Sequence, residues 1–474
     1  MMARMTKLGA RKRFPVVTTL MLILALCAAA GLPGCGNPVV IIPDAGLQAA
    51  IREALNKPQG NIYGSELAWL KELDAASRGI QDLRGLEYCT SLEALGLWDN
   101  QILDLTPLAK LTSLTWLTLA ENQISDLSPL ARLTKLTQLS LAANRITDIS
   151  PLANLTSLTW LGLESNQISD ISPLVNLTSL TVLGLWINQI NNIFPLINLT
   201  KLTVLSLGQN QITNISPLAN LTSLTTLSLG QNQITNISPL ANLTNLAGLG
   251  LGDNQVSDIS YLANLAGLTN LSLGTNQISD VSPLAKLTSL TTLSLEENQI
   301  SNISPLAELT SLTTLWLETN QISNMSPLGN LTSLTELGLG MNQISDMSSL
   351  SNLSNLKRLT LDHNQIADIR ALSNLTDLRV IWLDNNNITD ISPLSGLAKI
   401  GEVEEDGWLE EREGIAVCLG LSGNQIAAVE PLVGNVGLSE GDGIDLRGNP
   451  LSSDSLNTYL PQLEERGVNV LYGV

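Results

Sequence analysis

The chain has 474 residues, long enough for two or three ordinary domains, but it contains only 2 Phe and 5 Tyr beside much Leu, Asn, Ser and Thr, so one small motif must be used many times. The formal net charge is −19, and because the five basic residues before Cys35 have no acidic neighbour, the chain beyond residue 34 carries 19 Lys and Arg against 43 Asp and Glu, or −24. A surface this acidic repels phosphate backbones, which excludes a general nucleic-acid binder.

Residues 1–34 have the features of an export signal. A basic segment precedes the apolar run PVVTTLMLILALCAAAG, which is long for a core strand and short for a membrane span. The run ends in LPGC, which resembles the lipobox of bacterial lipoproteins, where the Cys is acylated and becomes the new N-terminus. The resemblance implies a signal peptide over 1–34, lipid on Cys35 and a short tether over 35–43. The chain would then be lipid-anchored at the bacterial cell envelope or surface; secretion without lipid and an uncleaved anchor are the alternatives.

Residues 44–69 are predicted to form a helical N-terminal cap. In DAGLQAAIREALNK, Asp44 is placed to cap a helix, and Leu47, Ile51 and Leu55 fall on one face of it. That face is suited to covering the first unit of whatever follows.

A 22-residue repeat occupies residues 70–400. The pattern is LxxLxxLxLxxNxIxxIxxLxxL, and the eighteen residues LSLGQNQITNISPLANLT occur twice, at 205–222 and 227–244. In the LxL segment the leucines alternate with outward residues, which predicts a short strand. One repeat, here called a coil, cannot bury its leucines alone, so coils must stack with strands about 4.8 Å apart around a shared core. The Asn that follows the strand turns the chain away from it, and we expect its side-chain amide to satisfy backbone groups of adjacent coils, so that the asparagines form a ladder. This Asn recurs without insertion at Asn100, Asn122, Asn144, Asn166, Asn188, Asn210, Asn232, Asn254, Asn276, Asn298, Asn320, Asn342, Asn364 and Asn386.

This is the pattern of leucine-rich repeats, and segments such as ISDISPL at 168–174 resemble the repeats of internalin-like bacterial proteins. The resemblance implies an α/β fold: a right-handed leucine-rich repeat solenoid with one parallel β-sheet on its concave face, short 3₁₀ turns on its convex face and a cap at each end. The helical segment at 44–69 resembles the N-terminal cap of the same family. Arg78 takes the Asn position in the first coil, and Cys89 takes a core Leu position, where we expect it to be buried.

Two further positions recur after each repeat Asn. Pro follows by seven residues in most coils, where the short repeat leaves room for a 3₁₀ turn and Pro suits its first position. Asp or Asn follows by four residues, from Asp104 to Asp390. We interpret this row as side chains that cap the turn before SPL; a row of cation ligands is the alternative.

The residues that flank each LxL segment on its exposed side are the candidate binding surface. Because core positions hardly vary between coils, function must lie where the outward positions differ, and large aromatic residues there favour a partner-binding role over chance exposure. Lys357, Arg358 and Arg379 lie near the later aromatics, with His363 in a patch of mixed charge. Six of the 8 Trp occupy these outward positions: Trp98, Trp116, Trp160, Trp186, Trp316 and Trp382.

The regular spacing breaks once, between Asn386 and Asn424. The excess is GEVEEDGWLEEREGIA, residues 401–416, an acidic insertion that lacks the LxL spacing. We expect a solvated loop that can be removed without unfolding the array, or a flap over Lys357, Arg358 and Arg379. Residues 417–474 then supply the last repeats and a C-terminal cap with a helix that ends at Gly467, and LRGNPLS resembles a closing segment common in the family.

The sequence favours an exported recognition protein and not an enzyme. It has no nucleophile elbow, phosphate-binding loop or zinc-ligand spacing, and we expect no cofactor and no metal. The predicted partners are a protein or glycan bound on the concave face and the membrane, through the N-terminal lipid, with no nucleic acid. The alternative is a structural or adhesive envelope spacer that has no specific ligand on that face.

Overall fold

A computed structural model describes residues 37–403 and 409–473, and the chain divides into two compact units, the first ending at Ile212 and the second beginning at Thr213. The predicted signal peptide, the lipidation site Cys35 and Trp408 of the insertion lie outside the described residues. No helix within 37–403 or 409–473 is long and apolar enough to cross a membrane.

The N-terminal cap consists of α2 (Ala45–Ala54) and α3 (Gly64–Leu67). As predicted, Asp44 caps α2: its Oδ1 accepts a hydrogen bond from the Leu47 backbone N–H at 3.0 Å. Its Oδ2 accepts one from the Gln81 N–H at 2.8 Å, which ties the cap to the first coil. Leu47 and Ile51 are fully buried, so α2 covers the end of the leucine core.

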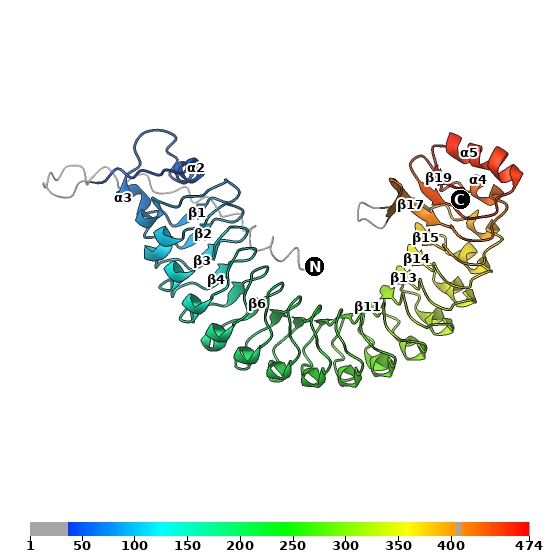
Figure 1. Ribbon diagram of the computed structural model, residues 1–474, viewed down its shortest axis with the longest axis horizontal. Coiled ribbons are helices and arrows are strands. Elements are labelled where there is room, and N and C mark those ends of the chain that lie inside the picture. The colour runs from blue at the N-terminus through cyan, green and yellow to red at the C-terminus, as the bar shows by residue number, and fades with distance from the viewer. Residues whose placement is uncertain (1–36, 404–408, 474) are drawn as a thin grey trace. The chain divides into compact units, whose positions relative to one another are not determined.

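In the first unit, parallel three-residue strands are added one per coil, and 3₁₀ turns line the opposite side of the stack (Figure 1). The strands are β1 (Glu72–Asp74), β2 (Ala94–Gly96), β3 (Trp116–Thr118), β4 (Gln138–Ser140), β5 (Trp160–Gly162), β6 (Val182–Gly184) and β7 (Val204–Ser206). The 3₁₀ turns are η2 (Leu86–Tyr88), η3 (Thr106–Lys110), η4 (Ser128–Leu130), η5 (Ser150–Leu152), η6 (Ser172–Asn176) and η7 (Phe194–Leu196).

The second unit continues the same pattern in its own coils. Its parallel strands are β8 (Thr226–Ser228), β9 (Gly248–Gly250), β10 (Asn270–Ser272), β11 (Thr292–Ser294), β12 (Thr314–Trp316), β13 (Glu336–Gly338), β14 (Arg358–Thr360), β15 (Val380–Trp382), β17 (Ile415–Gly420), β18 (Gly443–Asp445) and β19 (Asn469–Leu471). Its 3₁₀ turns are η8 (Ser216–Leu218), η9 (Ser238–Leu240), η10 (Ser260–Leu262), η11 (Ser282–Lys286), η12 (Ser304–Leu306), η13 (Ser326–Asn330), η14 (Ser348–Asn352), η15 (Arg370–Asn374) and η16 (Ser392–Leu394).

The repeat Asn side chains hold adjacent coils in register. Asn144 donates to the carbonyl oxygens of Leu119 and Leu141 at 2.9 and 3.1 Å, and its Oδ1 accepts from the Ile124 N–H at 2.9 Å. The same bonds recur in both units and extend past the insertion to Asn424 and Asn449. The predicted Asn ladder is therefore confirmed, and each Asn satisfies backbone groups that the stacked leucines would otherwise leave buried without a partner.

The Asp or Asn four residues after each repeat Asn caps the following turn, as predicted. Asp126 Oδ1, for example, accepts from the Ser128 N–H at 2.8 Å. In η4 the Pro is the second residue of the turn and not the first. Among the described residues, no group of three or more His, Cys, Asp or Glu is placed to hold a metal ion.

The residue before each repeat Asn has a left-handed backbone conformation that the repeat pattern did not predict, because Gly occupies the position only in the last two coils, at Gly423 and Gly448. Its φ lies between 51° and 57° from Ser77 to Asn385, and even β-branched Ile187 and Thr275 adopt it. Non-glycine residues pay for this conformation in strain. Hydrogen bonds to the next coil impose it: the Asp99 N–H donates to the Ala120 carbonyl at 3.0 Å, and the Asn100 N–H donates to the Glu121 carbonyl at 3.1 Å.

Cys89 is fully buried in the first unit, as its Leu position predicts. Burial raises the pKa of its thiol to about 12, so the thiol stays protonated at neutral pH. Cys418 in β17 is buried in the same way, and its thiol donates to the Gly443 carbonyl at 3.3 Å.

The insertion forms a hairpin in its second half, so the prediction of a solvated loop is wrong there. β16 (Glu410–Arg412) pairs antiparallel with β17 through a turn at Glu413 and Gly414, both with positive φ. Arg412 is the reason: its guanidinium forms two hydrogen bonds of 3.0 Å to Asp384 and one of 2.9 Å to Asp445. Because both carboxylates are almost fully buried, the hairpin supplies the cation that they need.

The C-terminal cap includes α4 (Glu430–Val433), the π-helical segment η17 (Ser455–Tyr459) and α5 (Leu460–Glu465). The chain turns out of α5 at Gly467, whose φ is 83°, in agreement with the prediction. Arg466 donates to the carbonyl oxygens of Val433 and Asn435, both at 2.8 Å, and so joins α5 to the segment after α4.

We expect Asn144→Ala to loosen its part of the first unit. The substitution leaves the Ile124 N–H buried without an acceptor and removes one of the two amide donors from each of the Leu119 and Leu141 carbonyls, at a cost of about 3 kcal/mol. Backbone amides near Ile124 should then exchange with deuterium about 100-fold faster. The exposed neighbour offers the control Arg145→Ala. Unchanged exchange in the Asn144 variant would show that the ladder does not set local stability.

We expect Arg412→Met to destabilise the last coils by about 3 kcal/mol, because Asp384 loses its buried counter-ion while Asp445 keeps Arg447. Urea unfolding followed by circular dichroism measures this loss. The control is Glu411→Ala, an exposed change on the same strand. Deletion of residues 401–416 removes Arg412 as well and should cost a similar amount, contrary to the dispensable loop that the sequence suggests. Wild-type stability in both variants would contradict this role.

Candidate partner-binding face

The six outward tryptophans fall into two groups, each within one unit and on its strand side. The first patch is defined as Trp98, Trp116, Trp160 and Trp186. The second patch is defined as Trp316, Lys357, Arg358, Arg379 and Trp382. Trp186 is 36% exposed and the other five tryptophans are half-buried, so most of the rings lie against the sheet and do not stand free in solvent.

The first patch is built from two rows that cross the strands. Trp116 and Trp160 are the first residues of β3 and β5, with Gln138 of β4 between them in the ladder. Trp98 and Trp186 lie two residues beyond β2 and β6. The parallel register therefore fixes the spacing of the rings, and no loop has to move to assemble them.

A carboxylate lies within the first patch. Glu164 is two residues beyond β5 and lies over two glycines: a Cβ at Gly162 would be 2.7 Å from the Trp160 ring and 2.9 Å from Glu164 Oε2, and one at Gly184 would collide with the carboxylate. Oε2 is buried and has no hydrogen-bond partner. Burial raises the pKa of Glu164 above its ordinary value. Its spacing from Asn166 puts Glu164 in the same outward row as Trp98 and Trp186, but spacing alone does not show that the carboxylate is desolvated.

The second patch contains a stacked arginine. The Arg358 guanidinium lies 5.2 Å from the centre of the Trp316 ring and 5.0 Å from that of Trp382, which is cation–π distance on both sides. Arg358 Nε and Trp382 Nε1 are buried and have no hydrogen-bond partner. The three residues come from β14, β12 and β15, so the sheet itself builds the stack.

Two carboxylates lie next to this stack. Glu318 lies over Gly338 and accepts a hydrogen bond from the Thr360 hydroxyl at 3.2 Å. Burial raises the pKa of Glu318 and of Glu336, although the charge of Arg358 opposes the rise in both. The arginine therefore gives these half-buried acids a nearby positive charge.

The remaining predicted residues of the second patch surround this stack. Lys357 and Arg379 occupy equivalent positions in adjacent coils, joined by a 2.8 Å bond from the Arg379 N–H to the Lys357 carbonyl. His363 is half-exposed, with Nδ1 3.0 Å from Asp362 and Nε2 3.0 Å from Asn385. Asp384, which the sequence placed in the same mixed-charge patch, is instead buried against Arg412.

The most exposed tryptophan among the described residues lies outside both patches. Trp69, which follows α3 in the N-terminal cap, is 77% exposed. Trp69 lies outside the repeats, so the repeat pattern does not predict that it belongs to the binding surface. It can therefore serve as a control for the tryptophans of the two patches.

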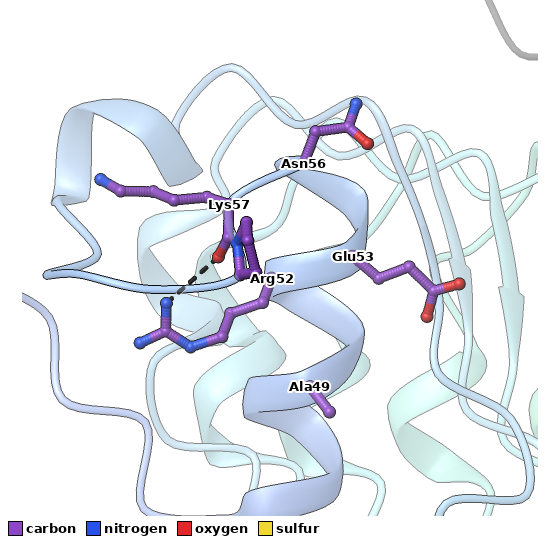
Figure 2. A pocket seen from close by; sticks show the side chains of 6 residues that line it. Ala49, Arg52, Glu53, Asn56 and Lys57 are labelled. Atoms are coloured by element: carbon purple, nitrogen blue, oxygen red, sulfur yellow. Dashed lines mark hydrogen bonds between the residues drawn. The ribbon is translucent and has the colours of Figure 1, made fainter.

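A surface hollow lies at the C-terminal end of α2, away from the strands (Figure 2). Its charged groups do not converge on a common point: Glu53 and Lys57 point in opposite directions, and Arg52 donates to the Lys57 carbonyl at 3.2 Å. Lys57 pairs with Glu66, and Glu53 pairs with Arg78. The hollow is therefore the edge of the cap, with its charges already used within the fold.

Comparisons with known proteins agree with this architecture. The family model "Leucine Rich repeats (2 copies)" matches residues 112–154, 200–242, 244–286, 288–330 and 354–396. The crystal structure of an internalin, InlF of Listeria monocytogenes, is 41% identical, with a TM-score of 0.63, over 72% of this chain and 95% of that one. No curated protein matches the chain in sequence.

Two more distant structures share the fold. The functional domain of InlJ from Listeria monocytogenes is 24% identical, with a TM-score of 0.69, over 87% of this chain and 84% of that one. A leucine-rich repeat protein of Leptospira interrogans is 23% identical, with a TM-score of 0.69, over 86% of this chain and 97% of that one. Together with the match to InlF, these findings show that the chain belongs to the leucine-rich repeat family and resembles the bacterial internalins.

Proposed function

We propose that this protein is an exported, lipid-anchored, non-enzymatic recognition protein that binds a protein or glycan through the strand side of its repeats. One observation carries the proposal: large aromatics gather in two patches, whereas the coils from Asn210 to Asn298 have no aromatic residue at their outward positions. Between them, the row that holds Trp98 and Trp186 in the first unit is occupied by glycine in successive coils, at Gly208, Gly230, Gly252 and Gly274.

The energetics favour a bound partner over chance. A Trp side chain buries about 150 to 250 Å² in all at little entropic cost, and here the sheet covers part of that area and a partner would cover the exposed remainder. Truncating an anchor of this kind typically loses on the order of 2 kcal/mol or more of binding free energy. Because the ladder fixes the rings in advance, binding needs no rearrangement of the backbone. Glu164 beside the first patch would favour a basic group on the partner, whereas Lys357, Arg358 and Arg379 of the second patch would favour an acidic group.

A spacer role is the second candidate. The identical stretches 205–222 and 227–244 and the row of glycines favour it, because coils that offer no distinctive side chain add length and little else. A spacer does not account for the tryptophans, and this difference separates the two functions in experiments.

The anchor has its own test. If Cys35 carries lipid, cells that express the chain should incorporate labelled palmitate into it, and Cys35→Ala should abolish the label. The change removes the acylated atom and leaves the described fold untouched. Label that persists in the variant would contradict lipid attachment at Cys35.

The binding role is tested by capture. Residues 36–474 serve as bait against envelope extracts and a glycan array, and the captured ligand is then titrated. Trp116→Ser combined with Trp160→Ser should weaken binding at least tenfold, because two anchors of one row are lost. The thermal melt should change little, since the core leucines are untouched. Trp69→Ser, which removes an exposed ring outside the patches, should bind normally. Equal affinity in the double variant would favour the spacer.

A further inference from the structure

The two patches differ in what fills the space beside their aromatic rings. In the second patch the chain supplies its own cation, since Arg358 stacks on Trp316 and Trp382 and its charge lies near Glu318 and Glu336. In the first patch, Trp160 and Glu164 share the space above Gly162, and among the described residues no Lys or Arg acts on the carboxylate. Glu164 Oε2 is buried without any partner.

This arrangement is unfavourable for the protein alone. A carboxylate oxygen removed from water without a hydrogen-bond partner costs free energy that other contacts must supply. Glycine at both 162 and 184 lets Glu164 lie flat on the sheet, where a Cβ at either position would displace it. Trp186 occupies the position equivalent to Glu164 in the next coil and is the most exposed ring of the patch. Glu164 thus lies beside Trp160 of its own coil and over Gly184, the last residue of the strand that precedes Trp186.

We infer that Trp160, Glu164 and Trp186 form a site for an arginine or lysine side chain of a protein partner. The inference rests on the proposed function and specifies its partner as a protein with an exposed basic residue. The bound cation would stack on an indole and pair with the carboxylate, much as Arg358 lies between rings and near acids in the second patch. The net charge of −19 favours the approach of such a partner.

A sugar could also bind to an indole beside a carboxylate. The charge of the site decides between a sugar and a basic side chain as the ligand. Within the described part of the chain no Lys or Arg acts on Glu164, and Glu121, two coils earlier in the same unit, adds an exposed negative charge. A neutral sugar would leave this excess of negative charge uncompensated, whereas a guanidinium or ammonium group neutralises the desolvated carboxylate directly.

The test uses the full chain and three defined probes: hexa-arginine, its neutral isostere hexa-citrulline, and the oligosaccharide chitohexaose. Calorimetric titration should give at least tenfold tighter binding of hexa-arginine than of the other two. Glu164→Gln should lower the affinity for hexa-arginine at least fivefold. Glu308→Gln makes the same charge change at an exposed position on the second unit and should stay within twofold of wild type. Equal losses in both variants, or a Glu164-dependent preference for the sugar, would overturn the inference.

Stability gives an independent readout. Because burial raises the pKa of Glu164 in the folded state, the folded protein binds this proton more tightly than the unfolded chain, and stability falls as pH rises from the unfolded to the folded pKa. Glu164→Gln should therefore raise the melting temperature at pH 7, and the gain should vanish below the ordinary glutamate pKa. A variant that is less stable at pH 7 would show that Glu164 is a structural acceptor, against the inference.

The outcomes also separate the inference from the proposed function. One outcome is that Glu164→Gln leaves the affinity for hexa-arginine unchanged while the Trp116 and Trp160 double variant still loses its captured partner. The site for a basic residue is then rejected, and the proposed partner binding on the strand side stands. If the double variant keeps its partner, the strand side is rejected as the binding surface, and the inference that depends on it fails as well.

Discussion

The hydrogen bonds of the repeat asparagines are the constraint on which the rest of the structure depends. A stack of leucine side chains is indifferent to small shifts along the strand direction, because dispersion and burial of apolar surface are not directional. Each Asn amide removes that freedom, since it must meet carbonyls of its own coil and of the preceding coil while its oxygen accepts an N–H from the preceding coil. The left-handed residue before each Asn is a consequence: the chain accepts local strain because the bonds to the next coil outweigh it.

Register, in turn, converts a linear repeat into rows of side chains. Residues 22 apart become neighbours across parallel strands, so Trp116 and Trp160 lie in one row although 44 residues separate them. The same geometry explains the glycines beside the acids. A long side chain at the edge of one strand can fold over the next coil only if that coil offers no Cβ, as Gly184 does for Glu164 and Gly338 does for Glu318. Glycine here provides space for an acid and is not simply a bland filler.

The sequence predicted what depends on period and failed where side chains from different coils meet. The strands, the Asn ladder, the turn caps and the buried Cys89 follow from residue type and spacing within one coil, and all were found where the pattern put them. The half-burial of the tryptophans and the stack of Arg358 between two rings depend on which side chains lie in neighbouring rows. Sequence spacing names those neighbours but does not say which way each flexible side chain turns.

Arg412 shows the same limit most clearly and indicates how the repeat tolerates its one interruption. In sequence it is a lone cation in an acidic run, which suggests solvated charge. In the fold, Asp384 and Asp445 occupy strand-side positions of coils on either side of β17 and are nearly inaccessible to water. Two buried acids so placed would repel each other and lose solvation, so coils that carry them are stable only with a cation between them. A 22-residue coil is too short to bring a second strand back beside its own, whereas the hairpin does so and places Arg412 next to β17. The extra residues are therefore the means by which two acids can be buried in this part of the second unit, and the acidic composition around Arg412 follows from keeping the rest of the hairpin in solvent.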